Sequence, residues 1–542
     1  MSRRRILVTS TVAVVAFLSG GWFMQQGSRP SESVYQRARL FDDILSHVSD
    51  LYVDSIDQKQ LYRMAIDGML GELRDPYTGY LDGRELRNLN ELSTGNYGGI
   101  GAQIEVRDGA IVVVVPMPET PAERAGVQSG DRIVEVSGKT TVGMTQDDAV
   151  RALRGPEGSQ VTLKIVRAGA TELITYTLTR ARIHNRFVRT VMMLTDGVGY
   201  IETNPFSQSA ADELQAAVDS LKRLGMRSLV FDLRNNPGGL LTEGLGVADL
   251  FLNPGQEIVA TRGRAPRSTE TFADEAPQRY PQLPLVVLVN GYSASSAEIV
   301  AGALQDHDRA LLIGAPTFGK GLVQTVYRLG GDAALKLTTA RWYTPSGRSI
   351  QRPSRNGFEP DNLPEDSTPP ADTTPQPTYR TDGGRTVRGG GGINPDILIR
   401  ADSTDVRAAE RLTQMLGRNA PKYLDALAAF AFQARQRFGV SSPTFTPTAE
   451  MRAAFLEQLR QRGVELDEQT LRIAGHFMDQ QLADQAARFN FGRQGQVRRA
   501  ARDDPVLAEA VRVAAAARTP AELVAMAARP TAERPPAVPP RP

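Results

Sequence analysis

Three serines fall within four residues of the stretch NGYSASSAEIVAGAL, residues 290–304. The stretch follows the apolar run PLVVLV, which is typical of a buried strand, and leads into a helical pattern that begins near Ser295 or Ser296. The first amides of a helix lack partners and its dipole is positive there, so this end stabilises an anion. A capping serine uses the same geometry. The pattern therefore fits either a cap or a nucleophile, and a nucleophile also needs a base and an oxyanion hole.

The composition limits which base could activate a serine. The chain has no cysteine and four histidines, so no thiolate and no multi-histidine metal centre is expected. His307 lies on the same predicted helix as Ser295, about 18 Å farther along its axis at about 1.5 Å per residue, and cannot reach it. The other histidines lie in segments without catalytic context, at positions 47, 184 and 476.

Lysine is the remaining base. Lys320 stands between two glycines in TFGKGLVQ, after the apolar run ALLIG. Because a helix followed by a returning strand brings the chain back to the same edge of a sheet, Lys320 is expected to approach Ser295. A lysine acts as a base when burial lowers its pKa.

The surrounding segments alternate between strand and helix patterns, which predicts an α/β domain. GVGYIET and SLVFDLR are predicted strands, with the amphipathic helix SAADELQAAVDSLKRLG between them. SLVFDLR runs into NNPGGLLTEG, where Gly238 and Gly239 permit a turn that aims an amide into the site. A plain β-turn is the alternative interpretation of this pair.

Residues 95–182 combine short strands, glycine turns and one helix, TQDDAVRALRG, with Thr145 as its expected N-cap. GGIGA and AGVQSGDRIVEVSG make this block resemble a PDZ domain. The resemblance implies that the block binds unstructured C-terminal tails, and that the carboxylate-binding loop is lined by Gly99, Ile100, Gly101 and Ala102. Arg154 either contacts an acidic group or stays solvated.

DLRNNPGG, VNGYSASSAEIVAGALQD, GAPTFGKGLVQ, YTPSGRSIQ and GINPDI follow one another in an order and spacing that resemble the carboxyl-terminal processing peptidases. This family, also called the tail-specific proteases, is a serine–lysine family with a crotonase-like core. The resemblance extends over about residues 31–400. It implies Ser295 as nucleophile, since Glu298 fixes the register of the serine motif, with Lys320 as base and Gln324 as assisting residue.

The resemblance also implies an oxyanion hole made by the amide of Ser296 and an amide of Gly238 or Gly239, with no cofactor. Ser296 and Ala297 stand where the family usually has alanine and then serine, so a competing hydroxyl lies beside the nucleophile. Asp306 matches an aspartate sometimes implicated in the family, and a structural role at the helix end is equally expected.

The expected fold is α/β, with a crotonase-like protease core, an inserted β-rich PDZ domain, an N-terminal helical segment and a C-terminal helical extension. The predicted boundaries are a signal anchor or signal peptide at 1–27, the helical segment at 31–92, the PDZ domain at 95–182, the core at 183–352 and 391–402, a low-complexity insert at 353–390, the extension at 403–529 and a proline-rich tail at 530–542.

Three arginines precede a mostly apolar run at residues 6–23, which predicts an export segment, more often an uncleaved anchor than a removed signal peptide. The rest of the chain is then expected in the periplasm, on the outer side of the inner membrane. Basic and acidic residues number 63 and 61 and are well mixed, so no nucleic-acid partner is expected. The extension is expected to form a homo-oligomer, shield the site, bind a regulatory adaptor or only pack.

The sequence thus predicts a serine endopeptidase that cleaves exported proteins near unstructured, apolar C-termini, which its PDZ domain holds. The main alternative is a catalytically inactive, membrane-anchored PDZ module that binds such tails without cutting them. A crotonase-like hydrolase of small molecules is a weaker alternative, because it gives no use for a PDZ domain.

Overall fold

The computed structural model describes residues 34–107, 110–167, 170–352, 376–400 and 403–528. The chain divides into two compact units, residues 1–80 and 81–542. The first contains the helices α2 (Val34–Leu51) and α3 (Gln58–Gly71), as the helical periodicity predicted, and the short strand β1 (Gly79–Leu81) begins at its end. Among the described residues no helix is long and apolar enough to cross a bilayer. The predicted export segment lies outside the described residues.

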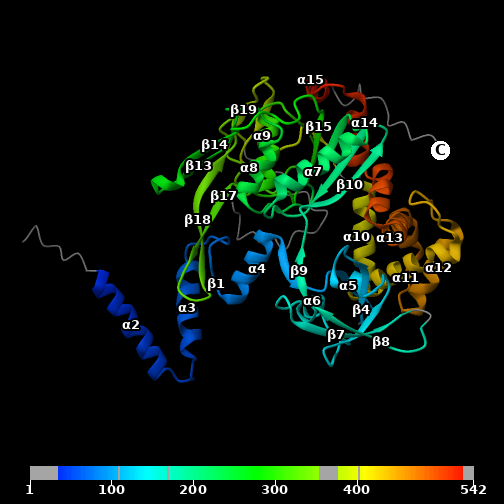
Figure 1. Cartoon of the computed structure of the whole chain (residues 1–542), viewed down its shortest axis with the longest axis horizontal. Coiled ribbons are helices and arrows are strands. Elements are labelled where there is room, and N and C mark those ends of the chain that lie inside the picture. Colours follow the sequence, from blue (N-terminus) through cyan, green and yellow to red (C-terminus); the bar gives the residue numbers. More distant parts are fainter. Residues whose placement is uncertain (1–33, 108–109, 168–169, 353–375, 401–402, 529–542) are drawn as a thin grey trace, which may run out of the picture. The chain divides into compact units, whose positions relative to one another are not determined.

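The second unit is built on a six-stranded sheet. Its order is β10 (Val188–Thr195), β11 (Val198–Thr203), β12 (Ser228–Asp232), β15 (Leu285–Val289), β16 (Leu311–Gly314) and β21 (Ile397–Leu398). Figure 1, which is coloured along the sequence, labels β10 and β15 of this sheet. The strands from β11 to β21 are parallel, and β10 pairs antiparallel to β11. The predicted strand–helix alternation therefore does form a parallel α/β sheet.

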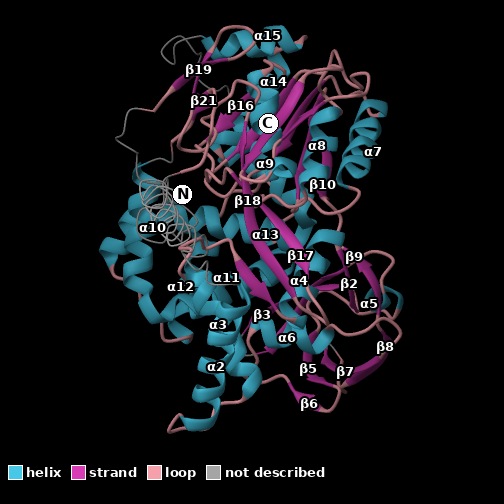
Figure 2. Ribbon diagram, turned by 90° about the vertical axis from the view of Figure 1, so that its left-hand side faces the viewer, coloured by secondary structure: helices cyan, strands magenta, loops and turns pink. Residues whose placement is uncertain are grey.

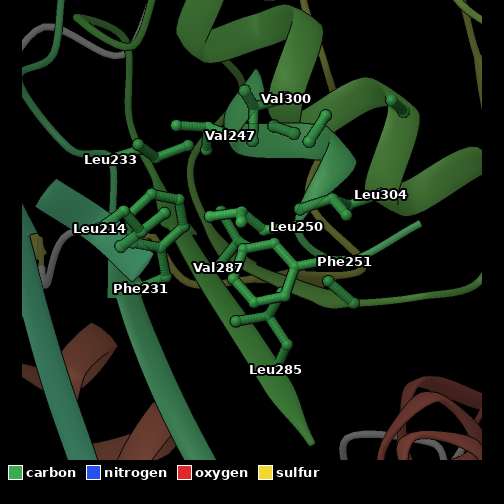
Figure 3. Close-up of a cluster of buried hydrophobic side chains, with 14 of the residues drawn as sticks. Leu214, Phe231, Leu233, Val247, Leu250, Phe251, Leu285, Val287, Val300 and Leu304 are labelled. Atoms are coloured by element: carbon green, nitrogen blue, oxygen red, sulfur yellow. The ribbon is translucent and has the colours of Figure 1, made fainter. Parts of the chain in front are cut away.

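Three helices pack apolar side chains against one face of this sheet: α7 (Ala210–Arg223), α8 (Leu241–Asp249) and α9 (Ser296–Asp306). Figure 3 shows Leu214 of α7 and Val300 of α9 in one cluster with Phe231 and Val287 of the sheet. All four side chains are fully buried. This face forms the main hydrophobic core, and it anchors the helix that begins at the serine stretch.

The C-terminal extension packs on the other face. Leu507 and Val513 of α14 (Pro505–Ala516) belong to one buried cluster with Val230, Val286 and Leu288. Figure 1 shows α14 beside β15. The last helices of the extension therefore form part of the protease core rather than a separate appendage.

The earlier helices of the extension have a core of their own. They are α10 (Ser403–Leu416), α11 (Ala420–Phe438), α12 (Ala449–Gln461) and α13 (Glu468–Asp503). Helix α15 (Pro520–Ala525) follows α14 at the end of the extension. The helical prediction for this region is confirmed. Within α13 the backbone leaves the helical region at Gly492, where φ is +67°.

A second sheet carries the strands around the predicted lysine. Among its five strands, β17 (Leu322–Arg328) pairs with β18 (Ala334–Tyr343), β18 with β13 (Glu257–Gly263) and β13 with β14 (Glu270–Ala273), each pair antiparallel. Figure 2 shows β17 and β18 as two long neighbouring strands. The end of the predicted low-complexity insert forms a hairpin of β19 (Thr378–Arg380) and β20 (Thr386–Arg388). Residues 353–375 of it lie outside the described residues.

Helix α4 (Gly83–Thr94) leads into the block predicted as a PDZ domain. Its antiparallel sheet has the order β3 (Ala102–Arg107), β4 (Ala110–Pro116), β5 (Arg132–Val136), β7 (Gln160–Val166) and β8 (Ile174–Thr179), with β6 (Lys139–Thr140) beside β5. β2 (Asn96–Gly99) pairs with β9 (Ala181–His184), and α5 (Pro121–Arg124) and α6 (Gln146–Leu153) complete the block. The block has its own buried core, and Thr145 caps α6 as predicted.

Candidate active site

Three loops leave the same edge of the central sheet. They follow β12, β15 and β16, which are parallel neighbours, so all three begin at carboxyl ends of strands. The first contains Gly238 and Gly239, the second contains Ser295, and the third contains Lys320. The predicted return of the chain to one sheet edge is therefore confirmed for the backbone.

Ser295 is the N-cap of α9 and has an unusual backbone conformation, with φ +54° and ψ −119°. Residues other than glycine seldom adopt such a positive φ, and holding one there costs about 1–3 kcal/mol. The surrounding structure must maintain this conformation. Strain of this kind is common where a side chain has to be held in one direction for chemistry.

The structure distinguishes the three serines. The Ser293 hydroxyl is fully buried, donates to Leu233 O at 2.8 Å and accepts from the Asn290 amide at 3.0 Å. The Ser296 hydroxyl is also buried and contacts Gly239 O at 3.1 Å and Leu240 O at 3.2 Å as their donor. Only Ser295 is partly exposed to solvent. Ser296 stands where the family usually has alanine. Its hydroxyl connects the first turn of α9 to the glycine turn.

Glu298 links the serine loop to the lysine loop. Its fully buried carboxylate accepts the Ser295 amide at 2.9 Å, the Gly319 amide at 2.7 Å and the Lys320 amide at 2.9 Å, and it also accepts the hydroxyl of Thr317. Burial raises the pKa of Glu298, and these hydrogen bonds oppose that rise. One side chain therefore fixes the backbones on which the predicted nucleophile and base stand.

The segment around Lys320 is tightly packed. Gly319 has φ +89°, and a Cβ there would lie 3.1 Å from Ile350 O. A Cβ at Gly321 would lie 2.9 Å from the Gln351 amide. The Lys320 carbonyl accepts a hydrogen bond from the Trp342 indole at 3.0 Å. The two glycines thus permit the close backbone packing that the sequence predicted around the lysine.

The glycine turn lies directly against Ser295. Gly238 has φ +93°, and a Cβ there would lie 2.7 Å from Ser295 Cβ and 2.9 Å from the Ser296 amide nitrogen. The Gly238 amide donates to Asn236 Oδ1 at 2.9 Å. The neighbouring Gly239 has φ +149°, and a Cβ there would lie 2.2 Å from Phe206 O. Glycine is therefore required at both positions, and the turn adjoins the N-terminus of α9.

Three asparagines that the sequence motifs did not single out hold this turn. The fully buried Asn236 donates to Thr203 Oγ1 at 3.0 Å and to Asn204 O at 2.7 Å. Asn290 accepts the Asn235 amide at 3.0 Å and donates to Asn235 Oδ1 at 2.9 Å. Asn235 and Asn236 form the pair before the proline and glycines, whereas Asn290 begins the serine stretch, and no local pattern indicates that they meet.

Arg234 connects the glycine turn to the C-terminal extension. Its guanidinium contacts Asp232 at 2.7 Å and Asp504, the N-cap of α14, at 2.5 Å. Burial opposes the charge of Arg234, yet Asp232 and Asp504 raise its pKa well above the ordinary value. The extension thereby contacts Arg234, which lies in the loop between β12 and Gly238.

Other predicted residues occupy varied positions. Gln324 lies on β17, and its amide nitrogen donates to Thr338 Oγ1 of β18 at 3.4 Å. Asp306 is buried and pairs with Arg348 at 2.6 Å, which favours the structural role. His307 ends α9, far from Ser295, and its ring contacts Asp382 and Glu257 O, each at 2.7 Å.

The glycine loop of the PDZ block is shaped by close approach. A Cβ at Gly98 would lie 2.1 Å from Gly155 O, and one at Gly101, where φ is +73°, would lie 2.3 Å from Thr120 Cβ. Ile100 between them is buried, and Ala102 opens β3. Arg154 does contact an acid: it pairs with Glu91 at 2.7 Å, and its guanidinium also stacks 4.2 Å from the centre of the Tyr97 ring.

Comparisons with known proteins agree with this architecture. Peptidase family S41 matches residues 197–363, the PDZ domain family matches 112–167, and the N-terminal domain of the activating protease CtpB matches 23–85. The carboxy-terminal-processing protease of Bartonella bacilliformis is 40% identical over 343 residues, which cover 62% of this chain and 77% of that protein.

The carboxy-terminal processing protease CtpA of Bacillus subtilis is 35% identical over 352 residues, or 64% of this chain and 74% of that protein. Among solved structures, the photosystem II D1 C-terminal processing protease is 29% identical, with a TM-score of 0.37, over 66% of this chain and 86% of that one. From its sequence relatives and its domain content, the chain belongs to the carboxy-terminal processing proteases, serine peptidases of family S41 with an inserted PDZ domain.

Proposed function

We propose that the chain cleaves exported proteins near their C-termini with Ser295 as nucleophile and Lys320 as general base. The observation that carries this proposal is the shared Glu298 carboxylate, which holds the backbones of both residues. Ser295 is also the member of its serine cluster that is partly exposed and strained. Nucleophilic catalysis needs this combination of a fixed nucleophile and a nearby base.

In the proposed reaction, neutral Lys320 takes the proton of the Ser295 hydroxyl while its oxygen attacks the scissile carbonyl. The oxyanion is stabilised by the amide of Ser296 and by that of Gly239, because the Gly238 amide already donates to Asn236. Lys320 then gives the proton to the leaving amine, which breaks the peptide bond. A water molecule, deprotonated by Lys320, then attacks the acyl carbon, the bond from that carbon to Ser295 Oγ breaks, and Lys320 returns the proton to Ser295 Oγ. Gln324 orients Lys320 once its side-chain amide has left its contact with Thr338 Oγ1.

We propose that the PDZ domain holds the apolar, unstructured C-terminal tail of the substrate. Its loop from Gly99 to Ala102 offers backbone amides to the tail carboxylate, and β3 offers an edge for strand addition. We further propose that the segment 6–23 places the enzyme on the periplasmic side of the inner membrane. The extension and the N-terminal helices are candidates for contacts with a second copy or an adaptor.

The test uses the purified full chain and a folded protein that carries an apolar, unstructured C-terminal tail. The wild-type protein is expected to generate new C-termini, measured by mass spectrometry, whereas Ser295→Ala and Lys320→Ala should cleave at least a thousandfold more slowly. Lys336→Ala, on β18, is the matched control and should retain activity. Tail binding by the wild-type protein without any cleavage would support the inactive PDZ module, which neither the relatives nor the site favours.

A further inference from the structure

The edge of β3 is where a bound tail would add as an extra strand. β3 lies at one end of the PDZ sheet order and pairs only with β4 among the described strands. Backbone groups alternate between the two sides of such a strand. The backbone groups of alternate residues, Ala102, Ile104 and Val106, point to the same side of β3. Ala102 lies opposite Pro116 of β4, which has no amide hydrogen to donate to it, so this side faces away from β4. Their outward groups are the ones that an added peptide strand would pair with.

One side chain already occupies part of this edge. The amide of Gln146 donates from Nε2 to Ile104 O at 2.9 Å and accepts at Oε1 from the Val106 amide at 3.0 Å. A residue of an added strand would use the same donor and acceptor. Gln146 is therefore bound to β3 in place of a ligand.

The position of Gln146 is itself fixed. It is the first residue of α6, directly after the N-cap Thr145. Thr145 Oγ1 accepts the Asp148 amide at 3.2 Å, and Asp148 accepts the Thr145 amide at 3.1 Å. This capping box fixes the backbone at the start of α6 beside β3. The contact of Gln146 with the strand therefore depends on a fixed helix start and not only on the flexibility of its side chain.

The part of the edge nearer the glycine loop is not used by α6. Ala102 begins β3 directly after Gly101, and Gln146 bonds only farther along, at Ile104 and Val106. Buried Ile100 and Leu153 belong to the apolar cluster on this side of the domain and suit an apolar terminal side chain. A tail anchored at the loop thus finds a short open edge and then a blocked one.

We propose that Gln146 limits how much of a substrate tail pairs with β3: it restricts strand pairing to the last few residues of the tail, and a longer extended tail pairs only by displacing it. This inference rests on the proposed role of the PDZ domain in tail capture. It concerns how much of a tail is recognised, which the cleavage mechanism itself does not decide.

The experiment measures binding of fluorescent peptides by anisotropy to the full chain carrying Ser295→Ala, so that no peptide is cleaved. A three-residue and a seven-residue peptide share the same apolar C-terminal residues and a free carboxylate. In this background Gln146→Ala should bind the seven-residue peptide about tenfold more tightly, because two competing hydrogen bonds are gone, and the three-residue peptide equally. Gln146→Leu, of similar size, should act in the same way.

Gln160→Ala, at the exposed start of β7, is the matched control and should change neither affinity. An unchanged or weaker affinity of the Gln146 variants for the longer peptide, with thermal unfolding as in the parent, would overturn the role of Gln146 alone. If neither peptide binds any variant, tail capture by the PDZ domain is wrong as well. Cleavage by the wild-type protein, measured separately, shows whether the proposed protease function survives.

Discussion

The amides of Ser295 and Lys320 donate to the same oxygen of Glu298, each at 2.9 Å. The two residues are far apart in sequence and stand on loops that follow neighbouring parallel strands. A buried carboxylate with several donors is a rigid connection, because breaking any bond leaves a buried polar group without a partner. The position of the proposed base relative to the nucleophile therefore depends on one acid that does not itself react.

Glu298→Gln tests this connection. The glutamine has about the same shape, but its NH₂ group would replace either the oxygen that accepts from Gly319 and Thr317 or the oxygen that accepts from Ser295 and Lys320, so at least one bond is lost. We expect kcat to fall by about tenfold to a hundredfold, since a hydrogen bond to a charged group contributes about 1.5–3 kcal/mol. Steady-state kinetics measure the change. Glu243→Gln, at the start of α8, is the control, and full kcat in Glu298→Gln would refute the positioning role.

Ser296→Ala removes the hydroxyl that contacts Gly239 O and Leu240 O. The glycine turn then loses its tie to α9, so the amide proposed for the oxyanion hole is held less firmly. We expect kcat to fall about threefold to tenfold with little change in KM, because the loss is felt mainly in the transition state. Ser293→Ala, which removes another buried hydroxyl, is the control and shows how far a loss of stability alone lowers kcat. Equal kcat for Ser296→Ala and wild type would make the hydroxyl a bystander.

Asp504→Asn tests whether the C-terminal extension supports the active site. Arg234 would keep Asp232 but lose its second carboxylate. Removing one partner of a largely buried charge destabilises the fold, so we expect a lower melting temperature together with reduced kcat. Differential scanning fluorimetry and tail cleavage measure both. Asp503→Asn, one residue earlier, breaks ion pairs that, within the described part of the chain, involve Arg499 and Arg502 of α13, and it should leave kcat unchanged. The same loss of kcat in both variants would speak against a specific role of Asp504.

Asp274 predicts a pH dependence of stability. Burial raises the pKa of Asp274 to about 7, and the neighbouring Asp249 carboxyl adds to the rise. The folded state therefore keeps a proton that the unfolded chain releases near pH 4, about the ordinary aspartate value. Stability should fall as the pH rises from about 4 to 7 and then level off. Asp274→Asn should flatten this part of a melting-temperature profile, whereas Asp196→Asn, in an exposed turn, should not. A profile unchanged by Asp274→Asn would contradict the shift.

Much of the architecture could be predicted from sequence because local patterns specify it. The buried strands, the start of α9 at the serine stretch and the Thr145 cap all depend on residues close together in the chain. The packing of α14 on the sheet could not be predicted, since an amphipathic helix reveals an apolar face but not the surface that it covers.

The site was predicted in part for the same reason. Ser295, Lys320 and the glycine pair belong to recognisable motifs, whereas Glu298 served only to align the serine motif. Its contacts with Thr317 and Gly319 join segments about twenty residues apart, which no local pattern reveals. Gln146 likewise gave no signal, because its partners on β3 are forty residues away.

The identity of the nucleophile can be measured directly. The full chain is treated with a fluorophosphonate, which reacts covalently with activated serines, and the labelled peptide is mapped by mass spectrometry. The account predicts one adduct, on Ser295, that disappears in Ser295→Ala and forms far more slowly in Lys320→Ala. An adduct on Ser293 or Ser296, or a preparation that cleaves tails while Ser295 stays unlabelled, would contradict it.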